Sequence, residues 1–360
     1  GLEVQSNYDM TIGSGPSASD PDMTAINNGT IEGKGDKQVA MVFTPEQDAN
    51  GLNALENRKD IVMNGSQSTG IALNGISGRA WKLKALNSGN IELNGTKSFG
   101  IALPKNSNLM TGSSMLNDTT GVITVNGNES GGIVVQSLIE SGILNKGTIS
   151  INSNNSFGMY SEIANEIKNE GQITLTSGSG SIGLRSAGGY LSNTSSGKVT
   201  ITGGSDNIGM YASAGKVENS GEIIIKSGTG NAGAVLDSSS ASGKNTGKIS
   251  VQGAGSKGVI VTNGSTFENT NELTVSGSDS YGLVARGGTI KGGTVGIDIT
   301  GSGSVGAYAG GGTTASNIEI TGGNVNVSNG GINFNSGQDG TLTLKNTKFV
   351  TGKESLGFYA

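Results

Sequence analysis

The chain has 360 residues, of which 64 are glycine and 4 are proline, and it contains neither cysteine nor histidine. Without these two residue types there is no disulfide framework, no thiolate or imidazole metal site, and no Ser-His-Asp or Cys-His nucleophile system. The net charge is −5 and no basic block stands out, which argues against nucleic acid and anionic membranes as partners. Collagen is excluded because glycine does not recur at every third position.

A repeat of about 26 residues runs through most of the sequence. One column of the repeat holds a small residue: Ala40, Gly70, Gly100, Gly132, Gly158, Gly183, Gly209, Gly233, Gly258, Gly282, Gly306, Gly331 and Gly357. A second column holds asparagine: Asn28, Asn57, Asn87, Asn117, Asn145, Asn169, Asn193, Asn219, Asn245 and Asn269. The unit reads N-x-G-x-I-x-I and then, about five residues later, S-x-G-I. Such periodic apolar residues exclude disorder.

Each unit predicts three short strands. The first alternates apolar and polar residues, as at Ile91 and Leu93, and a period of two is typical of a half-buried strand. The second is predicted to place Phe99, Ile101 and Leu103 on one inward face. The third is short, with an apolar residue two positions before each asparagine of the column. No helical pattern separates the strands, and the connections are too short for βαβ crossovers.

A chain of short strands that returns at this spacing pairs its backbone by stacking each strand on its copy in the neighbouring unit. The sequence therefore predicts an all-β, right-handed parallel β-helix of about 13 rungs, with three short strands per rung. The inward columns would form a continuous apolar core. The asparagine column is interpreted as structural, because side-chain amides stacked rung on rung can hydrogen-bond one another in a ladder.

In chain order the repeat divides the sequence into four parts: 1–27, an irregular or partial rung; 28–135, rungs with long corner insertions; 136–309, a regular β-helix; and 310–360, a less regular β-helix. In the last part Val325 and Val327 fall too close to Gly331 for the repeat, and Leu344 falls too far from Gly357. The chain is expected to stop in a second strand without a polar cap, as a fragment of a longer solenoid does.

An enzymatic function is not expected. Four segments match G-x-G-x-x-G, at 178–183, 228–233, 253–258 and 301–306. Each falls between the first and second strand of a unit, so these segments are by-products of the repeat, and no cofactor or metal is predicted. Some β-helices are polysaccharide lyases or hydrolases, and such sites need clustered carboxylates. The outward acids Glu92 and Asp298 lie several rungs apart, which makes this alternative the weakest.

One candidate binding surface lies near the N-terminal end. Three consecutive units take 14 residues from the second strand to the next column asparagine, whereas later units take 7 to 10. Equal insertions at one corner of adjacent rungs would lie about 4.8 Å apart and form one composite surface. This surface contains the only tryptophan, and aromatic residues with cations are common binding hot spots. Its predicted partner-binding residues are Arg79, Trp81, Lys82 and Lys84; the alternative is that Trp81 packs inward.

A second candidate surface is the column that follows the inward residue of the second strand. It is predicted to point outward and comprises Ala72, Ala102, Val134, Tyr160, Arg185, Tyr211, Val235, Ile260, Val284, Tyr308, Asn333 and Tyr359. A stripe of apolar and aromatic residues is unusual for a solvated face. Its predicted partner-binding residues are Tyr160, Arg185, Tyr211, Tyr308 and Tyr359, which would receive a glycan ring or a partner protein. The alternative is that these residues reflect β-propensity alone.

The repeat resembles the passenger domains of Gram-negative type V autotransporters. It is most similar to the very large fusobacterial autotransporter adhesins, whose repeats read much like Asn145-Lys-Gly-Thr-Ile-Ser-Ile followed by Ser-Phe-Gly-Met-Tyr-Ser161, and the likeness covers residues 28–309. The resemblance implies a monomeric, surface-exposed rod involved in virulence, anchored in the outer membrane by a C-terminal β-barrel that this sequence lacks. Its partners would be host-cell glycans, protein receptors or other bacteria. A passive stalk that presents a distal binding tip is the alternative.

Overall fold

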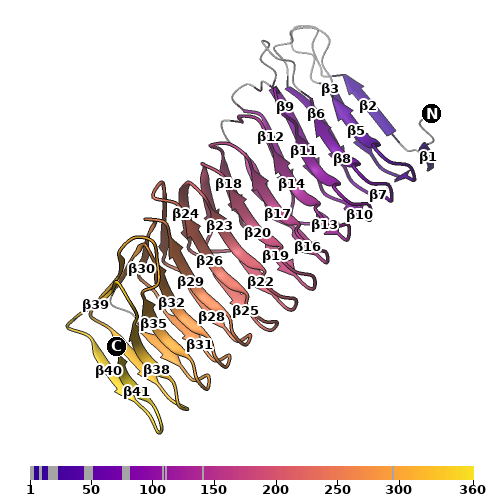
Figure 1. The fold of residues 1–360 in the computed structure, drawn as a ribbon. Helices are drawn as coiled ribbons and strands as arrows, with labels where there is room; N and C mark the ends of the chain where they lie inside the picture. The colour runs from indigo at the N-terminus through magenta and orange to yellow at the C-terminus, as the bar shows by residue number, and fades with distance from the viewer. Residues whose placement is uncertain are drawn as a thin grey trace. The chain divides into compact units, whose positions relative to one another are not determined.

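The computed structural model describes residues 4–7, 10–14, 23–43, 52–74, 82–107, 109, 112–139, 142–293 and 296–360. Every regular element in these ranges is a β-strand, and none of their residues forms a helix long and apolar enough to cross a membrane. Strands β3 to β41 form thirteen successive triplets within the described residues, one triplet per rung (Figure 1). The predicted all-β parallel β-helix is therefore confirmed.

The chain divides into two compact units, Gly1–Thr174 and Leu175–Ala360. In the first unit the first strands of the rungs form a first sheet of β1 (Val4–Asn7), β4 (Thr30–Gly33), β7 (Asp60–Met63), β10 (Asn90–Leu93), β13 (Val122–Val125), β16 (Thr148–Ile151) and β19 (Gln172–Leu175). The second sheet comprises β5 (Val39–Phe43), β8 (Thr69–Leu73), β11 (Phe99–Leu103), β14 (Gly131–Val135) and β17 (Phe157–Ser161). The third comprises β2 (Met10–Ser14), β3 (Met23–Asn27), β6 (Leu52–Asn57), β9 (Lys82–Asn87), β12 (Ser114–Asn117), β15 (Ile143–Asn145) and β18 (Glu166–Asn169). All pairs are parallel except β1 with β4 and β2 with β3.

The second unit repeats this arrangement. Its first sheet comprises β22 (Lys198–Ile201), β25 (Glu222–Ile225), β28 (Lys248–Val251), β31 (Leu273–Val275), β34 (Ile297–Ile299), β37 (Asn324–Val327) and β40 (Lys348–Thr351). The second sheet comprises β20 (Ile182–Ser186), β23 (Ile208–Ala212), β26 (Ala232–Asp237), β29 (Lys257–Thr262), β32 (Tyr281–Arg286), β35 (Val305–Ala309), β38 (Ile332–Ser336) and β41 (Leu356–Tyr359). The third comprises β21 (Tyr190–Asn193), β24 (Gly215–Asn219), β27 (Ala241–Asn245), β30 (Thr266–Asn269), β33 (Thr289–Gly292), β36 (Ser316–Thr321) and β39 (Gly340–Lys345).

The alternating residues of the first strand form the core as predicted. Ile91 is 1 % exposed and Leu93 is fully buried, and the corresponding pairs in the later rungs are buried as well. Ile91 lies opposite Ile61 and Ile123 in the neighbouring rungs, so identical side chains stack along the core. Each such burial contributes about 1.5–3 kcal/mol before the entropy of ordering the chain is subtracted.

The asparagine ladder is also confirmed. Asn57 donates from Nδ2 to Asn87 Oδ1 at 2.8 Å, and Asn87 donates to Asn117 Oδ1 at the same distance. Nδ2–Oδ1 bonds of this kind run through Asn27, Asn57, Asn87, Asn117, Asn145 and Asn169 in the first unit and through Asn193, Asn219, Asn245 and Asn269 in the second. The prediction that Asn28 opens this column is wrong. Asn27 lies opposite Asn57, and it is Asn27 that precedes Gly29 at the N-x-G spacing.

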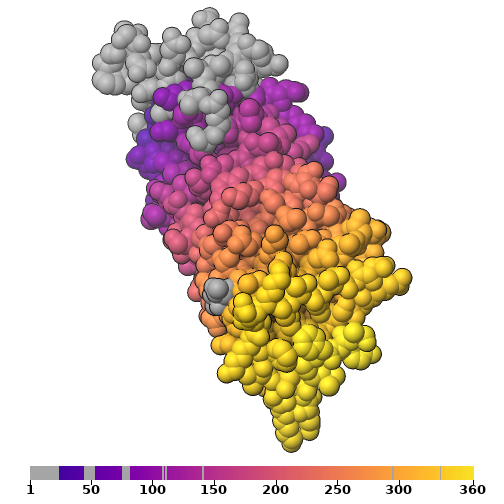
Figure 2. Space-filling view, turned by 90° about the vertical axis from the view of Figure 1, so that its left-hand side faces the viewer, coloured from indigo at the N-terminus to yellow at the C-terminus, as the bar shows by residue number. Residues whose placement is uncertain are grey.

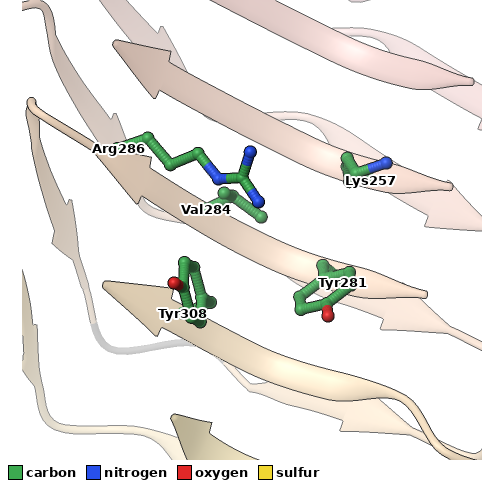
Figure 3. A pocket seen from close by; sticks show the side chains of 5 residues that line it. All are labelled: Lys257, Tyr281, Val284, Arg286 and Tyr308. Atoms are coloured by element: carbon green, nitrogen blue, oxygen red, sulfur yellow. The ribbon is translucent and has the colours of Figure 1, made fainter. Parts of the chain in front are cut away.

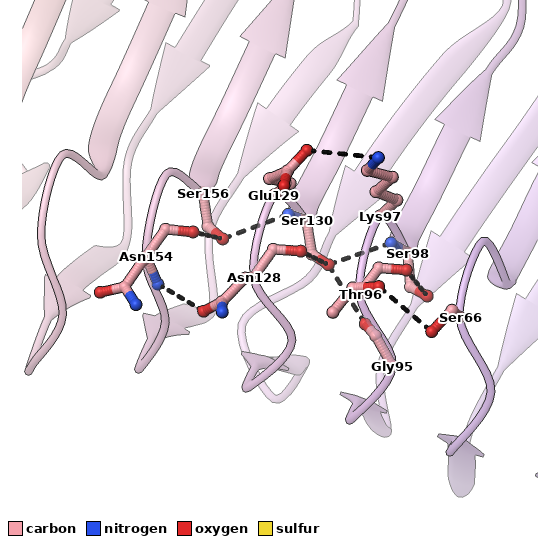
Figure 4. Close-up of polar contacts among 10 residues, drawn as sticks. All are labelled: Ser66, Gly95, Thr96, Lys97, Ser98, Asn128, Glu129, Ser130, Asn154 and Ser156. Carbon is pink, nitrogen blue, oxygen red and sulfur yellow. Dashed lines mark hydrogen bonds and ion pairs between the residues drawn. The ribbon is translucent and has the colours of Figure 1, made fainter.

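A second buried polar ladder occupies the corner between the first and second sheets (Figure 4). The Ser98 N–H donates to Ser130 Oγ at 3.0 Å, and the Ser130 N–H donates to Ser156 Oγ at 3.1 Å. The preceding residues, Lys97 and Glu129, have φ near +56°, a left-handed conformation that turns the chain into the second strand. This serine recurs in the S-x-G-I part of the repeat, but its place in the repeat alone does not predict a role for it.

The backbone of the second strand is irregular at its glycine, and we call this irregularity the glycine bulge; neighbouring rungs share it, so their strands stay in register. Phe157 lies opposite Gly131 and Met159 opposite Ile133, so the pairing passes over Gly158. The rings of Phe157 and Tyr160 stack at 5.2 Å, although residues three apart in a regular strand lie on opposite faces. The predicted inward position of Phe99, which belongs to the same column as Phe157, is therefore wrong: the bulge turns this column outward and leaves both side chains half-exposed.

The last rungs, which look less regular in the sequence, pair with the preceding rungs in the same three sheets. Val305 lies opposite Ile332 and Ala307 opposite Phe334, which places Asn333 level with Gly306. The assignments of Gly331 to the glycine column and of Asn333 to the outward column are therefore wrong, and Asn335 lies opposite Tyr308 instead. Leu344 belongs to the third sheet, since it pairs with Ile320.

Residues 340–359 form three strands that stack on the preceding rung, rather than a covering helix or loop. The final strand, β41, lies in the second sheet, as the sequence predicts for the last strand of the chain. Phe349, Leu356, Phe358 and Tyr359 are 43–59 % exposed, at the yellow end of the second unit (Figure 2). The Phe349 and Phe358 rings meet edge to face at 5.3 Å.

Candidate functional site

The first predicted surface is described only in part. Arg79 and Trp81 lie outside the described residues, as do most residues of the long insertions, so the composite surface stays a prediction. Lys82 and Lys84 lie on β9 in the third sheet of the first unit. Lys84 is exposed, whereas Lys82 is half-buried and its Cε lies close to Gly112. Neither lysine lies on the sheet that carries the predicted tyrosine column.

The second predicted surface follows the register of the second sheet. In the first unit Tyr160 is half-buried and stacks on Phe157. In the second unit the column continues without a break through Arg185, Tyr211, Val235, Ile260, Val284, Tyr308, Asn335 and Tyr359. Tyr211 and Tyr308 are half-buried and Tyr359 is 59 % exposed. The small members Ala72, Ala102, Val134 and Val284 are buried, so exposure along the column is uneven.

At one end of this column in the second unit, Arg185 lies over the ring of Tyr211, with its guanidinium carbon 5.6 Å from the ring centre. The Tyr211 hydroxyl donates to Asp237 Oδ2 at 3.4 Å. Burial raises the pKa of Tyr211 above its ordinary value, and the charge of Asp237 adds to this rise. The phenol is therefore neutral at physiological pH. Asp237 also accepts hydrogen bonds from Thr262 Oγ1 and Asn263 Nδ2.

On the outer face of the same sheet, a hollow of about 130 Å³ lies over β29, β32 and β35, beginning two strands beyond β23, the strand of Tyr211 (Figure 3). Its lining residues are Lys257, Tyr281, Val284, Arg286 and Tyr308, whose side chains all lie on the outer side of the sheet. The rings of Tyr281 and Tyr308 meet edge to face at 6.1 Å, and the Arg286 guanidinium carbon lies 5.9 Å from the centre of the Tyr308 ring. Lys257 Nζ donates to the carbonyl of Gly255 at 3.1 Å.

Sequence reasoning found Tyr308 but missed Lys257, Tyr281 and Arg286. Lys257 and Tyr281 belong to the column that the glycine bulge turns outward, and Tyr281 lies opposite Lys257 on the neighbouring strand. A signal was present in the sequence: the residue immediately before the column glycine is apolar in most rungs, but it is a lysine at Lys257 and a tyrosine at Tyr281, which suit an outward position better than an inward one. Arg286 lies at the end of β32, opposite Thr262.

Some of the charged side chains elsewhere on the described surface form ion pairs. In the second unit Lys198 pairs with Glu222, Lys244 with Glu268, and Lys345 with Glu319. Such exposed pairs contribute about 0–1 kcal/mol each. No group of three or more aspartate and glutamate side chains arranged to hold a metal ion occurs among the residues that the structure describes.

The chain matches no protein-family model, and neither the curated proteins nor the solved structures contain a significant match to it.

Proposed function

We propose that this chain is a segment of a surface adhesin that binds its partner without turnover, through the outer face of the second sheet. The observation that carries the proposal is the composition of that face in the second unit, where tyrosine, arginine and aliphatic side chains occupy adjacent strands. Arg185 and Tyr211 are followed along the sheet by the aliphatic residues Val235, Ile260 and Val284 and then by Tyr308. Tyrosine and arginine are the residues most enriched at binding hot spots.

The first sheet supports this choice by contrast. Several of its outward residues in the second unit are short and polar, such as Thr274, Asp298 and Asn326, which is usual for a solvated sheet face. Four tyrosines of the second unit, Tyr211, Tyr281, Tyr308 and Tyr359, lie on the second sheet, whereas Tyr190 lies on the third sheet beside Lys216.

The partners that suit this face are host-cell glycans, protein receptors or the surfaces of other bacteria, and the setting is the cell surface. This assignment rests on the resemblance of the repeat to autotransporter passenger domains. A flat sheet with tyrosine rings offers apolar area together with hydroxyl groups, which suits both sugar rings and protein surfaces.

A passive stalk is the second candidate, and a specific observation favours it. The two buried polar ladders and the stacked core repeat with little change from rung to rung in each unit, as a purely mechanical element requires. On this hypothesis the outward tyrosines reflect β-propensity alone.

A binding screen with three versions of the full chain separates these functions. The unmodified chain is tested against a glycan array and against cell-surface proteins. One variant carries Arg185→Thr, Tyr211→Thr and Tyr308→Thr, and the other carries Arg79→Ala, Trp81→Ala and Lys82→Ala. We expect the first variant to lose binding and both variants to keep the thermal melt of the parent. Loss of binding in the second variant alone would move the site to the N-terminal insertions. Absence of binding by the unmodified chain would support the stalk.

A further inference from the structure

We propose that the hollow between β29, β32 and β35 is a subsite for a negatively charged sugar, a pyranose that carries a carboxylate or a sulfate. This inference rests on the proposed adhesin function and specifies the chemistry of its ligand. Lys257 and Arg286 supply the positive charge, and Tyr281 and Tyr308 supply the aromatic surface.

The charge of the hollow is the first argument. Two of its five lining side chains are cations, and none is an acid. Neither Lys257 nor Arg286 has a carboxylate within 4.0 Å among the described residues, and the same holds for Lys226 and Lys248 of this unit. What distinguishes Lys257 and Arg286 is that two such cations line one hollow. The chain as a whole is acidic, with a net charge of −5. A local pair of cations without a counter-ion on such a chain favours an anionic ligand.

The geometry of Arg286 is the second argument. Its guanidinium carbon lies 5.9 Å from the centre of the Tyr308 ring, within reach of a cation–π contact, and such a contact leaves the N–H donors of the guanidinium available to a ligand. A carboxylate or sulfate accepts two parallel hydrogen bonds from such an edge. Lys257 lies on the next strand and contributes a second cation from the other side of Val284 (Figure 3).

The tyrosines are the third argument, and they favour a sugar over an acidic peptide. Tyr281 and Tyr308 are nearly perpendicular, at 78°, so the two rings line two sides of the hollow. Each combines an apolar ring with a hydroxyl group, which matches the alternating C–H and O–H groups of a pyranose. The volume of about 130 Å³ equals roughly four water molecules at ~30 Å³ each, enough for one acidic group and the adjoining edge of one ring.

Matched ligands and variants test the subsite. The full chain is titrated with oligosaccharides that are identical except for one neutral, carboxylated or sulfated unit, and with an acidic peptide of equal charge. We expect at least tenfold tighter binding of an acidic sugar than of its neutral counterpart, weakening with added salt. Comparing the affinities for the carboxylated and the sulfated oligosaccharide shows which acidic group the hollow prefers.

The variants Lys257→Met and Arg286→Gln should each reduce binding of the acidic sugar about tenfold or more. Lys248→Met is the matched control: it removes the same charge from the same unit, but on the first sheet, and should leave affinity unchanged. All three positions are outside the core, and equal thermal melts verify folding.

The outcomes separate the subsite from the adhesin function. Equal binding of neutral and acidic sugars, or no effect of Lys257→Met and Arg286→Gln, would overturn the subsite while leaving the adhesin function standing. Tighter binding of the acidic peptide would overturn the sugar assignment. If the chain binds neither glycans nor cell-surface proteins, the subsite and the adhesin function fail together.

Discussion

Replacing Asn145 with alanine tests whether the buried asparagine ladder stabilises the β-helix. Asn145 is fully buried, and its Nδ2 donates to Asn169 Oδ1 at 2.8 Å and to the carbonyls of Gly147 and Gln172, both at 3.3 Å. Its Oδ1 accepts from Asn117 Nδ2 at 2.8 Å. The substitution removes all four hydrogen bonds, each worth about 0.5–1.5 kcal/mol net.

The cost is smaller than the sum of four such bonds at their upper value, because some partners keep another bond. Asn117 Nδ2 retains the carbonyls of Gly121 and Thr148 at 3.2 and 3.3 Å, and the Gly147 carbonyl retains the N–H of Gln172. We therefore expect Asn145→Ala to lower the free energy of unfolding by about 2–4 kcal/mol.

Asn152→Ala is the matched control, because Asn152 lies in the same rung at an exposed position. Its Nδ2 donates to Asn126 Oδ1 at 2.8 Å in a solvent-exposed row, and its loss should cost less than about 0.5 kcal/mol. Urea unfolding followed by circular dichroism, with hydrogen exchange at the neighbouring amides, measures both variants. Solenoids can unfold in stages, so the exchange data locate the loss. Equal effects of the two substitutions would refute a stabilising role for the ladder.

Two further predictions concern the glycine of the second-strand bulge and the half-buried carboxylate of Glu218. Gly132→Ala should destabilise the first unit by about 1–3 kcal/mol, because the added Cβ would lie 2.6 Å from the carbonyl oxygen of Gly158. Gly188→Ala is the control: its added Cβ would meet no atom within 4 Å, so it should have almost no effect in the same urea assay. The Tyr190 hydroxyl donates to Glu218 Oε2 at 2.6 Å, and this hydrogen bond lowers the pKa of the Glu218 carboxyl. The ionised carboxylate therefore stabilises the fold above about pH 4.5, the ordinary pKa of the group, and this stabilisation is lost as the pH falls through the lower pKa of the folded state. Tyr190→Phe should raise the pKa of Glu218 in a carboxyl NMR titration and reduce this acid-side loss of stability; an unchanged titration would contradict the assignment.

The repeat made the core and the asparagine ladder predictable, because both follow directly from period and residue type. The inward positions of Ile91 and Leu93 alternate with polar residues in most copies of the strand, and a strand of period two has only one face to bury. Asparagine at a fixed position in stacked rungs can meet only its own copy, so the ladder from Asn57 to Asn87 required no knowledge of other contacts.

The outward surface was less predictable, because side-chain direction depends on hydrogen-bond pairing that the sequence does not display. Strict alternation places Phe157 on the inward face, but the pairing passes over Gly158 and turns Phe157 outward against Tyr160. The glycine bulge leaves the apolar residues at the same sequence spacing, but it turns the side chain that precedes the glycine from the inner to the outer face of the sheet.

The sequence by itself thus determined which residues repeat, which strands exist and which columns fill the core. Only the tertiary structure decided which residues from different rungs become neighbours on the surface. Tyr281 and Arg286 meet Lys257 and Tyr308 because the bulge reverses one column and the inter-strand register aligns it with the next. Register is a property of paired backbones: a shift of one residue would exchange the two faces, and cross-strand hydrogen bonding resists that shift.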